Sequence, residues 1–159
     1  MERPYKRPES VLILVTTRAG ECLMMERTRP RGFWQSVTGS LRWGESAACA
    51  AQRELLEETG LHGGYRLVDL RNGVRFPIVP PWRERYAPNV HFNYEHWFAL
   101  ELPGHRTIRL DPFEHRQYRW LDAEQALSRA TSWTNRSIVR AWMVARLRSP
   151  AATSLSVNR

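Results

Sequence analysis

The sequence contains a single lysine, Lys6, although it carries a large excess of positive charge. Arginines supply the other cations, and 24 Lys and Arg residues against 16 Asp and Glu residues give a formal net charge of +8. A basic surface of this kind attracts polyanions, which include both nucleic acid and small phosphorylated molecules. Because the sequence has neither a nucleic-acid-binding motif nor a dense basic tract, we expect a small phosphorylated ligand and no nucleic-acid partner.

Cysteine and long apolar runs are also scarce. Cys22 and Cys49 lie far apart without metal-ligand spacing, which predicts two buried free thiols. The longest strongly apolar run, Val11–Val15, is too short to span a bilayer. The first ten residues are charged and contain proline, so they lack the character of a signal peptide. We therefore expect a cytoplasmic protein that makes no membrane contact.

The length and composition indicate one globular domain. A chain of 159 residues with 42% apolar residues can bury a core of its own. We predict a single domain over residues 5–148, followed by a flexible tail over residues 149–159. The sequence has no heptad repeat, so a monomer is the default expectation.

Apolar patterns predict strands on both sides of a central helix. Strand character is found at residues 10–17, 22–27, 33–38, 65–70, 74–79 and 93–102 and around Ile108. Asn72-Gly73 is typical of a tight turn between two of these strands. We expect an α/β (α+β) fold in which a mixed sheet is sandwiched between helices.

Two helices are predicted near the C-terminus. Asp122 and Gln125 form a capping-box pattern, which predicts a short helix ending near Ala130. Residues 134–148 form the second helix, and its apolar positions recur at helical spacing and predict a buried stripe. The stripe consists of Ile138, Val139, Trp142, Met143 and Leu147.

The chain is organised around the segment at residues 39–61, GSLRWGESAACAAQRELLEETGL. A helix is expected to begin after Ser46, which can act as the N-cap, and to end at Gly60. At about 100° per residue, Glu54, Glu57 and Glu58 fall within about a third of the helix circumference. Like charges so close repel unless a cation neutralises them, and Mg²⁺ prefers oxygen ligands of this kind. A solvated, charged helix face is the alternative interpretation.

The spacing within this segment is highly specific. Gly39 is followed after five residues by Glu45, and after seven more by RELLEETGL at residues 53–61. This pattern resembles the Nudix box at every defining position, so the chain is similar to the Nudix hydrolases. The resemblance implies the Nudix fold, a loop-helix-loop box, and cleavage of a diphosphate linkage with Mg²⁺, or Mn²⁺ as a substitute.

The resemblance also implies roles for particular residues. Glu54, Glu57 and Glu58 match the metal-binding carboxylates, and Arg53 and Glu45 match supporting residues. The carbonyl of Thr38 matches a further possible ligand. Many members have Gly-Gly where this chain has Thr38-Gly39, which suggests that its loop belongs to a subfamily.

Segments outside the box resemble one group within the family. They are FWQSVTGS at residues 33–40, RYAP at 85–88, EH at 114–115 and SWTNR at 132–136. These segments look like those of the bacterial dihydroneopterin triphosphate diphosphatases of folate synthesis. The resemblance implies release of pyrophosphate from 7,8-dihydroneopterin 3′-triphosphate, which leaves the monophosphate.

This second resemblance extends the predicted site beyond the helix. It implies that Glu114 is a catalytic, metal-binding carboxylate delivered by a loop. It also implies that Lys6, Arg27, Thr38 and Thr134 contact the substrate.

Side-chain chemistry suggests further contacts with the pterin ring. Trp34 or Trp133 could stack on the ring, with core packing as the alternative for both. Asn135 offers the amide edge that such a ring needs for paired hydrogen bonds.

The sequence leaves alternatives open for the general base, the attacked phosphorus and the substrate. The general base is Glu57 or Glu114, and the phosphorus that is attacked is not determined. A nucleoside triphosphate such as dATP or an oxidised deoxynucleotide is the alternative substrate. A non-catalytic Nudix-fold binding module is a remote alternative, because it predicts damage to carboxylates that are all present.

Overall fold

A computed structural model describes residues 4–149, in which seven strands form one mixed sheet. The strands are β1 (Glu9–Thr17), β2 (Glu21–Arg27), β3 (Trp34–Gln35), β4 (Val37–Ser40), β5 (Leu67–Pro77), β6 (Phe92–Leu102) and β7 (His115–Asp122). The α-helices are α1 (Ala47–Thr59), α2 (Ala123–Arg129) and α3 (Trp133–Arg148), and the single-turn 3-10 helices are η1 (Gly64–Arg66) and η2 (Trp82–Arg85).

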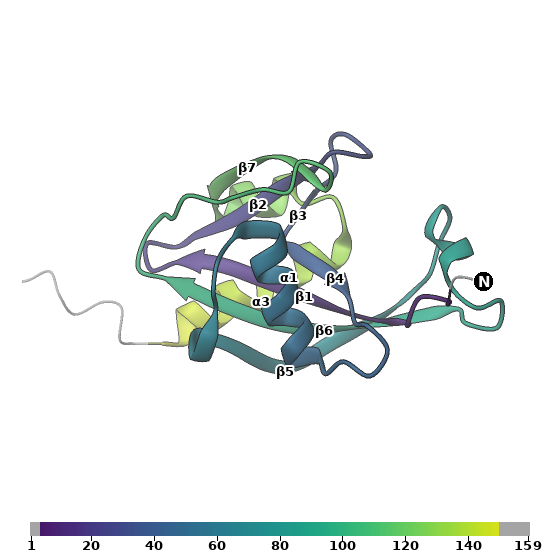
Figure 1. The fold of residues 1–159 in the computed structure, drawn as a ribbon. Coiled ribbons are helices and arrows are strands. Elements are labelled where there is room, and N and C mark those ends of the chain that lie inside the picture. Colours follow the sequence, from purple (N-terminus) through teal and green to yellow (C-terminus); the bar gives the residue numbers. More distant parts are fainter. Residues whose placement is uncertain (1–3, 150–159) are drawn as a thin grey trace, which may run out of the picture.

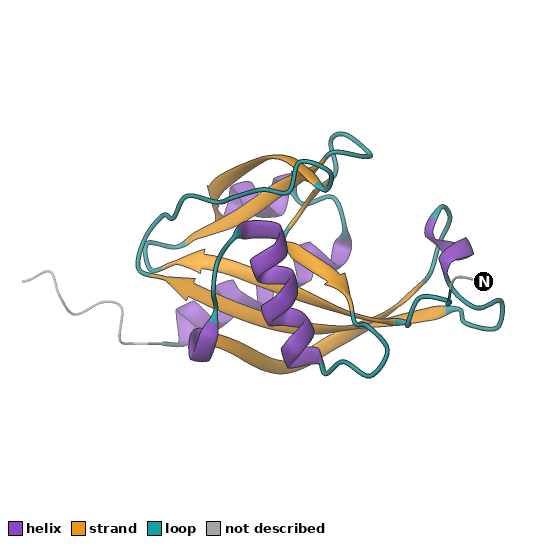
Figure 2. Cartoon of the chain, viewed as in Figure 1, coloured by secondary structure: helices purple, strands orange, loops and turns teal. Residues whose placement is uncertain are grey.

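Strand β1 lies at the centre of the sheet. It pairs in parallel with β6 on one side, and on the other it pairs antiparallel with β4 near its start and with β2 near its end. The strand order is β3-β2-β1-β6-β5, with β4 beside β1 and β7 beside β2. Helix α1 crosses one face of the sheet, while α2 and α3 cover the opposite face (Figures 1 and 2). The predicted mixed sheet between helices is confirmed.

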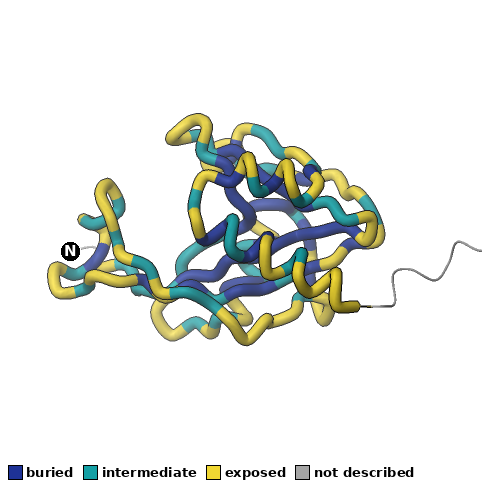
Figure 3. Tube along the Cα trace, turned by 180° about the vertical axis from the view of Figure 1, so that it is seen from behind, coloured by how far each residue is buried: buried dark blue, intermediate teal, exposed yellow. Residues whose placement is uncertain are grey.

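The two helical layers explain why β1 is apolar without alternation. Ile13 belongs to the cluster that contains Leu55 of α1, whereas Leu14 belongs to the cluster that contains Ile138 of α3. A strand that is covered on both faces buries every side chain, and the run Val11–Val15 is buried throughout. The central strands are accordingly the most buried part of the chain (Figure 3).

An arm projects from one end of the sheet. The N-terminal segment, the far ends of β5 and β6 and the loop between these strands form this arm, and most of it is exposed (Figures 1 and 3). The backbone amide of Lys6 donates to the carbonyl of Arg85 at 2.8 Å, so the N-terminal segment is attached to the loop.

The predicted turn at Asn72-Gly73 is wrong, because β5 runs through it as one strand. The pairing of β5 with β6 shifts register between Asp69 and Gly73, which is the geometry of a bulge. Local hydrogen bonds stabilise the bulge, since the Asp69 carboxylate accepts from the amide of Arg71 and the Asn72 side chain accepts from the amide of Gly73. Strand β6 pairs with β5 on both sides of the bulge, so the two halves of β5 form one continuous strand.

Some of the other local predictions are confirmed and others are wrong. The capping box of Asp122 and Gln125 and the short helix that follows it are confirmed. The segment around Ile108 is not a strand, although this side chain is buried between α1 and the sheet. Cys22 is a buried thiol, but Cys49 is exposed because it lies on the outer side of α1.

The C-terminal helix buries less than its pattern predicts. Ile138 and Val139 are fully buried, whereas Leu147 is 87% exposed because α3 extends beyond the sheet at this end. The predicted tail lies outside the described residues except for Ser149. No helix within residues 4–149 is long and apolar enough to cross a membrane.

We expect Ile138→Ala to lower the free energy of unfolding by about 2–5 kcal/mol, because it opens a cavity under α3. Leu147→Ala on the same helix is the matched control and should change stability by less than about 0.5 kcal/mol. Urea unfolding followed by circular dichroism measures both values. Equal losses in the two variants would contradict the burial pattern of α3.

Candidate active site

Helix α1 begins and ends where its sequence predicts. The Ser46 side chain caps the helix by accepting from the amide of Cys49 at 3.1 Å. Gly60 ends it in the left-handed conformation with φ of 75°, which glycine adopts without strain. These caps fix which residues of α1 face the sheet.

Arg53 is the centre of the ion pairs on α1. Its guanidinium donates to both carboxylate oxygens of Glu45 at 2.8 and 2.9 Å and to Glu54 at 2.7 Å. It also donates to the carbonyl of Ser40 at 3.0 Å, which joins the helix to the end of β4. Its hydrogen bonds lower the pKa of Glu45 to about 2. Arg53 therefore links Glu45, Glu54 and the end of β4.

Gly39 is required by the close approach of Glu54. A Cβ atom on Gly39 would lie 2.0 Å from the carboxyl carbon of Glu54, a distance at which real atoms cannot pack. The glycine thus allows the carboxylate to lie directly against the backbone of β4. Burial raises the pKa of Glu54, and the repulsion of Glu57 and Glu114 adds to this rise while Arg53 opposes it.

Glu58 lies one turn further along α1 and is buried, with 6% of its surface exposed. One of its oxygens accepts from the amide of Thr38 at 3.4 Å. Burial raises its pKa well above the ordinary value, and the charges of Glu54 and Glu114 raise it further. No ion pair formed by residues 4–149 includes Glu58. Its charge therefore lacks direct neutralisation.

Glu57 and Glu114 are less enclosed. The side chain of Glu57 is half-exposed and lies 3.4 Å from Arg53 and 3.7 Å from Arg42. Glu114 is on an exposed turn, which is attached to the end of β2 because the amide of Thr28 donates to the Glu114 carbonyl at 2.9 Å. The charge of Glu114 nevertheless affects Glu54 and Glu58, so this turn lies near α1.

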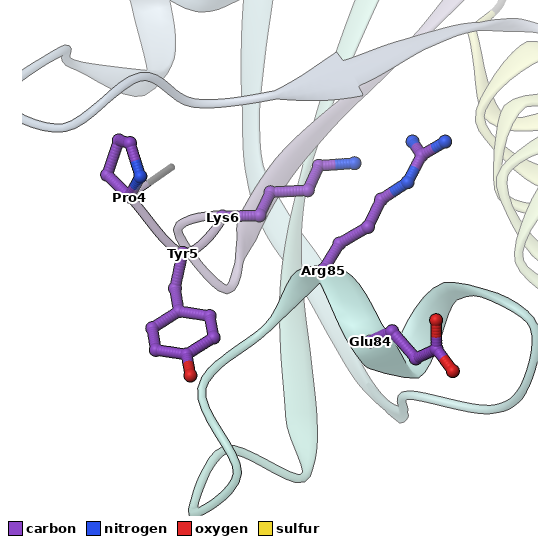
Figure 4. A pocket seen from close by; sticks show the side chains of 5 residues that line it. All are labelled: Pro4, Tyr5, Lys6, Glu84 and Arg85. Atoms are coloured by element: carbon purple, nitrogen blue, oxygen red, sulfur yellow. The ribbon is translucent and has the colours of Figure 1, made fainter. Parts of the chain in front are cut away.

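Three cations lie near the same carboxylates. Burial lowers the pKa of Lys6, Arg85 and Arg27 lower it further, and Glu54 and Glu114 oppose the change, so all these groups share one region. Lys6 and Arg85 line an open pocket and extend their charged ends the same way, whereas Tyr5 points elsewhere (Figure 4). Sequence reasoning did not select Arg85 as a site residue, although it lies within the RYAP segment at residues 85–88.

The two predicted threonines differ in position. Thr38 is beside Glu58, but its hydroxyl donates to the carbonyl of Val11 at 2.9 Å, which orients it toward β1. Thr134 is buried at the start of α3, with its hydroxyl 3.2 Å from that of Ser132. None of the hydrogen bonds or ion pairs given above joins Thr134 to the glutamates of α1. The predicted contact of Thr134 with the substrate stays a prediction.

The structure places the three residues suggested for pterin contacts in different surroundings. Trp34 is buried in the core under α3, in agreement with core packing. Trp133 is 48% exposed, so core packing is wrong for this residue, because its position at the start of α3 lies at the surface. Asn135 is buried, and its amide forms two hydrogen bonds within the protein, one through its oxygen and one through its nitrogen.

The donor set on α1 fits a hard divalent cation. Glu54 is partly buried and Glu58 is buried. Burial raises the pKa of Glu58 and the charge of Glu54 raises it further, and a cation bound by both carboxylates would remove their repulsion. Among residues 4–149, no group of three or more His, Cys, Asp or Glu side chains is gathered closely enough to hold a metal ion.

The family to which the whole chain belongs agrees with the box on α1 and its glutamates. The NUDIX domain profile matches residues 6–142, so the chain belongs to the Nudix hydrolase family. Nudix hydrolases generally use divalent metal ions.

Two similar proteins and one similar solved structure are named for hydrolysis of dihydroneopterin triphosphate. The chain is 40% identical over 147 residues to the dihydroneopterin triphosphate diphosphatase of Escherichia coli K12, which covers 90% of this chain and 97% of that protein. It is 33% identical to the enzyme of the same name from Haemophilus influenzae, over 87% of this chain and 89% of the relative. The structure of the E. coli dihydroneopterin triphosphate pyrophosphohydrolase superposes with a TM-score of 0.81 at 39% identity, and covers 90% of this chain and 99% of that one.

We expect Gly39→Ala to weaken Mn²⁺ binding about 10- to 100-fold, because the added methyl group displaces the Glu54 carboxylate. Isothermal titration calorimetry measures the affinity. Gly104→Ala is the control, since a Cβ atom there meets nothing within 4 Å. Unchanged affinity in Gly39→Ala would mean that Glu54 does not bind the ion.

We expect Glu58→Gln to stabilise the metal-free protein at neutral pH. A folded-state pKa above the unfolded value means that folding takes up a proton, so the wild type loses stability as the pH rises from about 4.3, the ordinary value for glutamate, toward the raised pKa. Glutamine does not titrate, so its advantage should grow over this range and be absent at lower pH. Urea unfolding in a chelator between pH 4 and about 8 measures the difference. An advantage that does not change with pH would contradict the buried charge.

Proposed function

We propose that this chain hydrolyses 7,8-dihydroneopterin 3′-triphosphate to the monophosphate and pyrophosphate, with Mg²⁺ as the metal ion. The observation that carries the proposal is the placement of the buried Glu58 and the partly buried Glu54 beside three cations, which suits a divalent ion bound to a triphosphate. The choice of substrate is supported by relatives of this name that match over nearly their full length.

Glu54 and Glu58 would hold the metal ion, with Glu57 and Glu114 as further ligands. When bound, such an ion neutralises phosphate charge and lowers the pKa of water. Arg53 holds Glu54 in place through its ion pair and ties it to Glu45. The carboxylate that accepts the proton of the attacking water is Glu57 or Glu114, since both are accessible.

Three cations would bind the phosphate chain. Lys6 and Arg85 extend from the arm and Arg27 from the end of β2, so they approach the carboxylates from a different part of the fold. Charge-assisted hydrogen bonds from such groups are about twice as strong as neutral ones. Burial and the nearby charges of Arg85 and Arg27 lower the pKa of Lys6. A bound phosphate group would reduce the repulsion among these three cations.

The remaining expectations are part of the same proposal. We propose a domain over residues 5–148, a monomer, a cytoplasmic location, a small-molecule substrate and no nucleic-acid partner. These assignments rest on the sequence arguments given above.

A substrate panel tests the function. The purified protein is given dihydroneopterin triphosphate, dATP and oxidised dGTP with Mg²⁺, and pyrophosphate release gives kcat/KM for each. We expect the pterin substrate to have the highest value. A higher value for either nucleotide supports a role in the nucleotide pool, and hydrolysis of none of them supports a binding module.

We expect Glu58→Gln to reduce turnover of dihydroneopterin triphosphate by at least 100-fold, on the order of the loss of one strong electrostatic contact in a transition state. Glu124→Gln removes an exposed glutamate on α2 and is the matched control. Circular dichroism checks that both variants are folded. Near-normal pyrophosphate release by Glu58→Gln at saturating Mg²⁺ would overturn the metal assignment.

A further inference from the structure

A buried carboxylate also lies on the face of the sheet opposite α1. Glu95 of β6 is 4% exposed, and no ion pair formed by residues 4–149 includes it. The indole of Trp97 donates to its Oε1 atom at 3.1 Å, and the Thr134 side chain lies near enough to lower the pKa of Glu95 slightly against the effect of burial. Burial raises the pKa of Glu95 to about 7. A buried carboxylate without a cation is costly, and this one has no part in the metal site on α1.

The next residue on the same face of β6 is also incompletely satisfied. Asn93 is 2% exposed, and its amide nitrogen donates to the Ser10 hydroxyl at 2.8 Å. Its Oδ1 atom has no hydrogen-bond partner within residues 4–149. Residues two apart on a strand point to the same side, so this free acceptor lies beside Glu95. Two acceptors in one buried place are suited to a ligand with several N–H donors.

The third polar residue of this region is already bonded to other parts of the protein. Asn135 at the start of α3 accepts from the amide of Ser36 at 2.7 Å and donates to the Ser132 hydroxyl at 2.7 Å. These bonds hold α3 to the strand connection before β4. The amide edge that the sequence suggests for pterin binding is therefore partly used in folding, whereas Asn93 Oδ1 is an acceptor without a partner within residues 4–149.

Sheet register relates Glu95 to the metal site. Glu95 pairs with Ser10 of β1, and Ser10 pairs with Ser40 of β4. Two strand spacings place Glu95 about 10 Å from Ser40. Ser40 follows Gly39, which lies against Glu54. This is the length scale of a bicyclic ring joined to a phosphate chain. Glu95 and Glu54 lie on opposite faces of the sheet, but among residues 4–149 β4 pairs with β1 alone, so a ligand at the unpaired edge of β4 can contact both faces.

We propose that Glu95, assisted by Asn93, binds the aminopyrimidinone edge of the pterin ring and selects the substrate. This edge presents a ring N–H and an exocyclic amino group side by side, and the two oxygens of a carboxylate accept from both. The inference rests on the proposed function for the identity of the ring. Guanine presents the same edge as a pterin, whereas adenine does not, so the site distinguishes ring systems by their donors.

The test compares Glu95→Gln with the wild type on dihydroneopterin triphosphate, GTP and dATP. Glutamine has the same shape but replaces an acceptor with an amino group that opposes the donors of the ring. We expect kcat/KM for the pterin and for GTP to fall about 10- to 100-fold, mainly through KM, as for the loss of a hydrogen bond to a charged group. The ratio of either value to that of dATP should fall at least tenfold.

Glu101→Gln is the matched control, because Glu101 is an exposed glutamate on the same strand. Circular dichroism reports whether Glu95→Gln is folded; if it is not, Asn93→Ala provides the same comparison of substrates. Equal losses on all three substrates indicate a structural role for Glu95 and overturn the inference, as does no loss on any. A wild type inactive on the pterin refutes the proposed function, while GTP against dATP still tests Glu95.

Discussion

The structure depends on the burial of acidic side chains between α1 and β4. Glu54 and Glu58 lie where the helix meets the strand, and Gly39 leaves the space that the first of them occupies. Water would stabilise both charges if they were exposed, so the fold stores an electrostatic cost at this place. Arg53 offsets this cost for Glu54 but not for Glu58. The remaining cost favours the binding of a cation at this place.

The rest of the molecule holds this contact in position. Strand β1 is apolar on both faces, so α1 and α3 can pack on opposite sides of the sheet. The arm and the end of β2 add cations, and the turn with Glu114 adds a carboxylate. Opposite charges therefore meet from separate elements, which suits a ligand made of phosphate groups and a divalent ion.

The two faces of the sheet present different chemical groups to a ligand. The side of α1 presents carboxylates for a metal ion, and the side of α3 presents Glu95 and Asn93 as acceptors for a ring. Ser10 and Ser40 connect the two places through strand pairing. A triphosphate group alone does not distinguish a pterin from a nucleotide, so specificity has to arise away from the metal.

The sequence alone determined the box helix, its caps and the family, because these depend on residues close together in the chain, whose spacing fixes a helical face. It also indicated the mixed sheet between helices. Only the tertiary structure decided that β5 continues through Asn72-Gly73, that Leu147 is exposed, and that the Asn135 amide is engaged. It alone joined Arg85 to Lys6 and revealed Glu95. Such features depend on strand register and on packing between distant segments, which local sequence patterns do not encode.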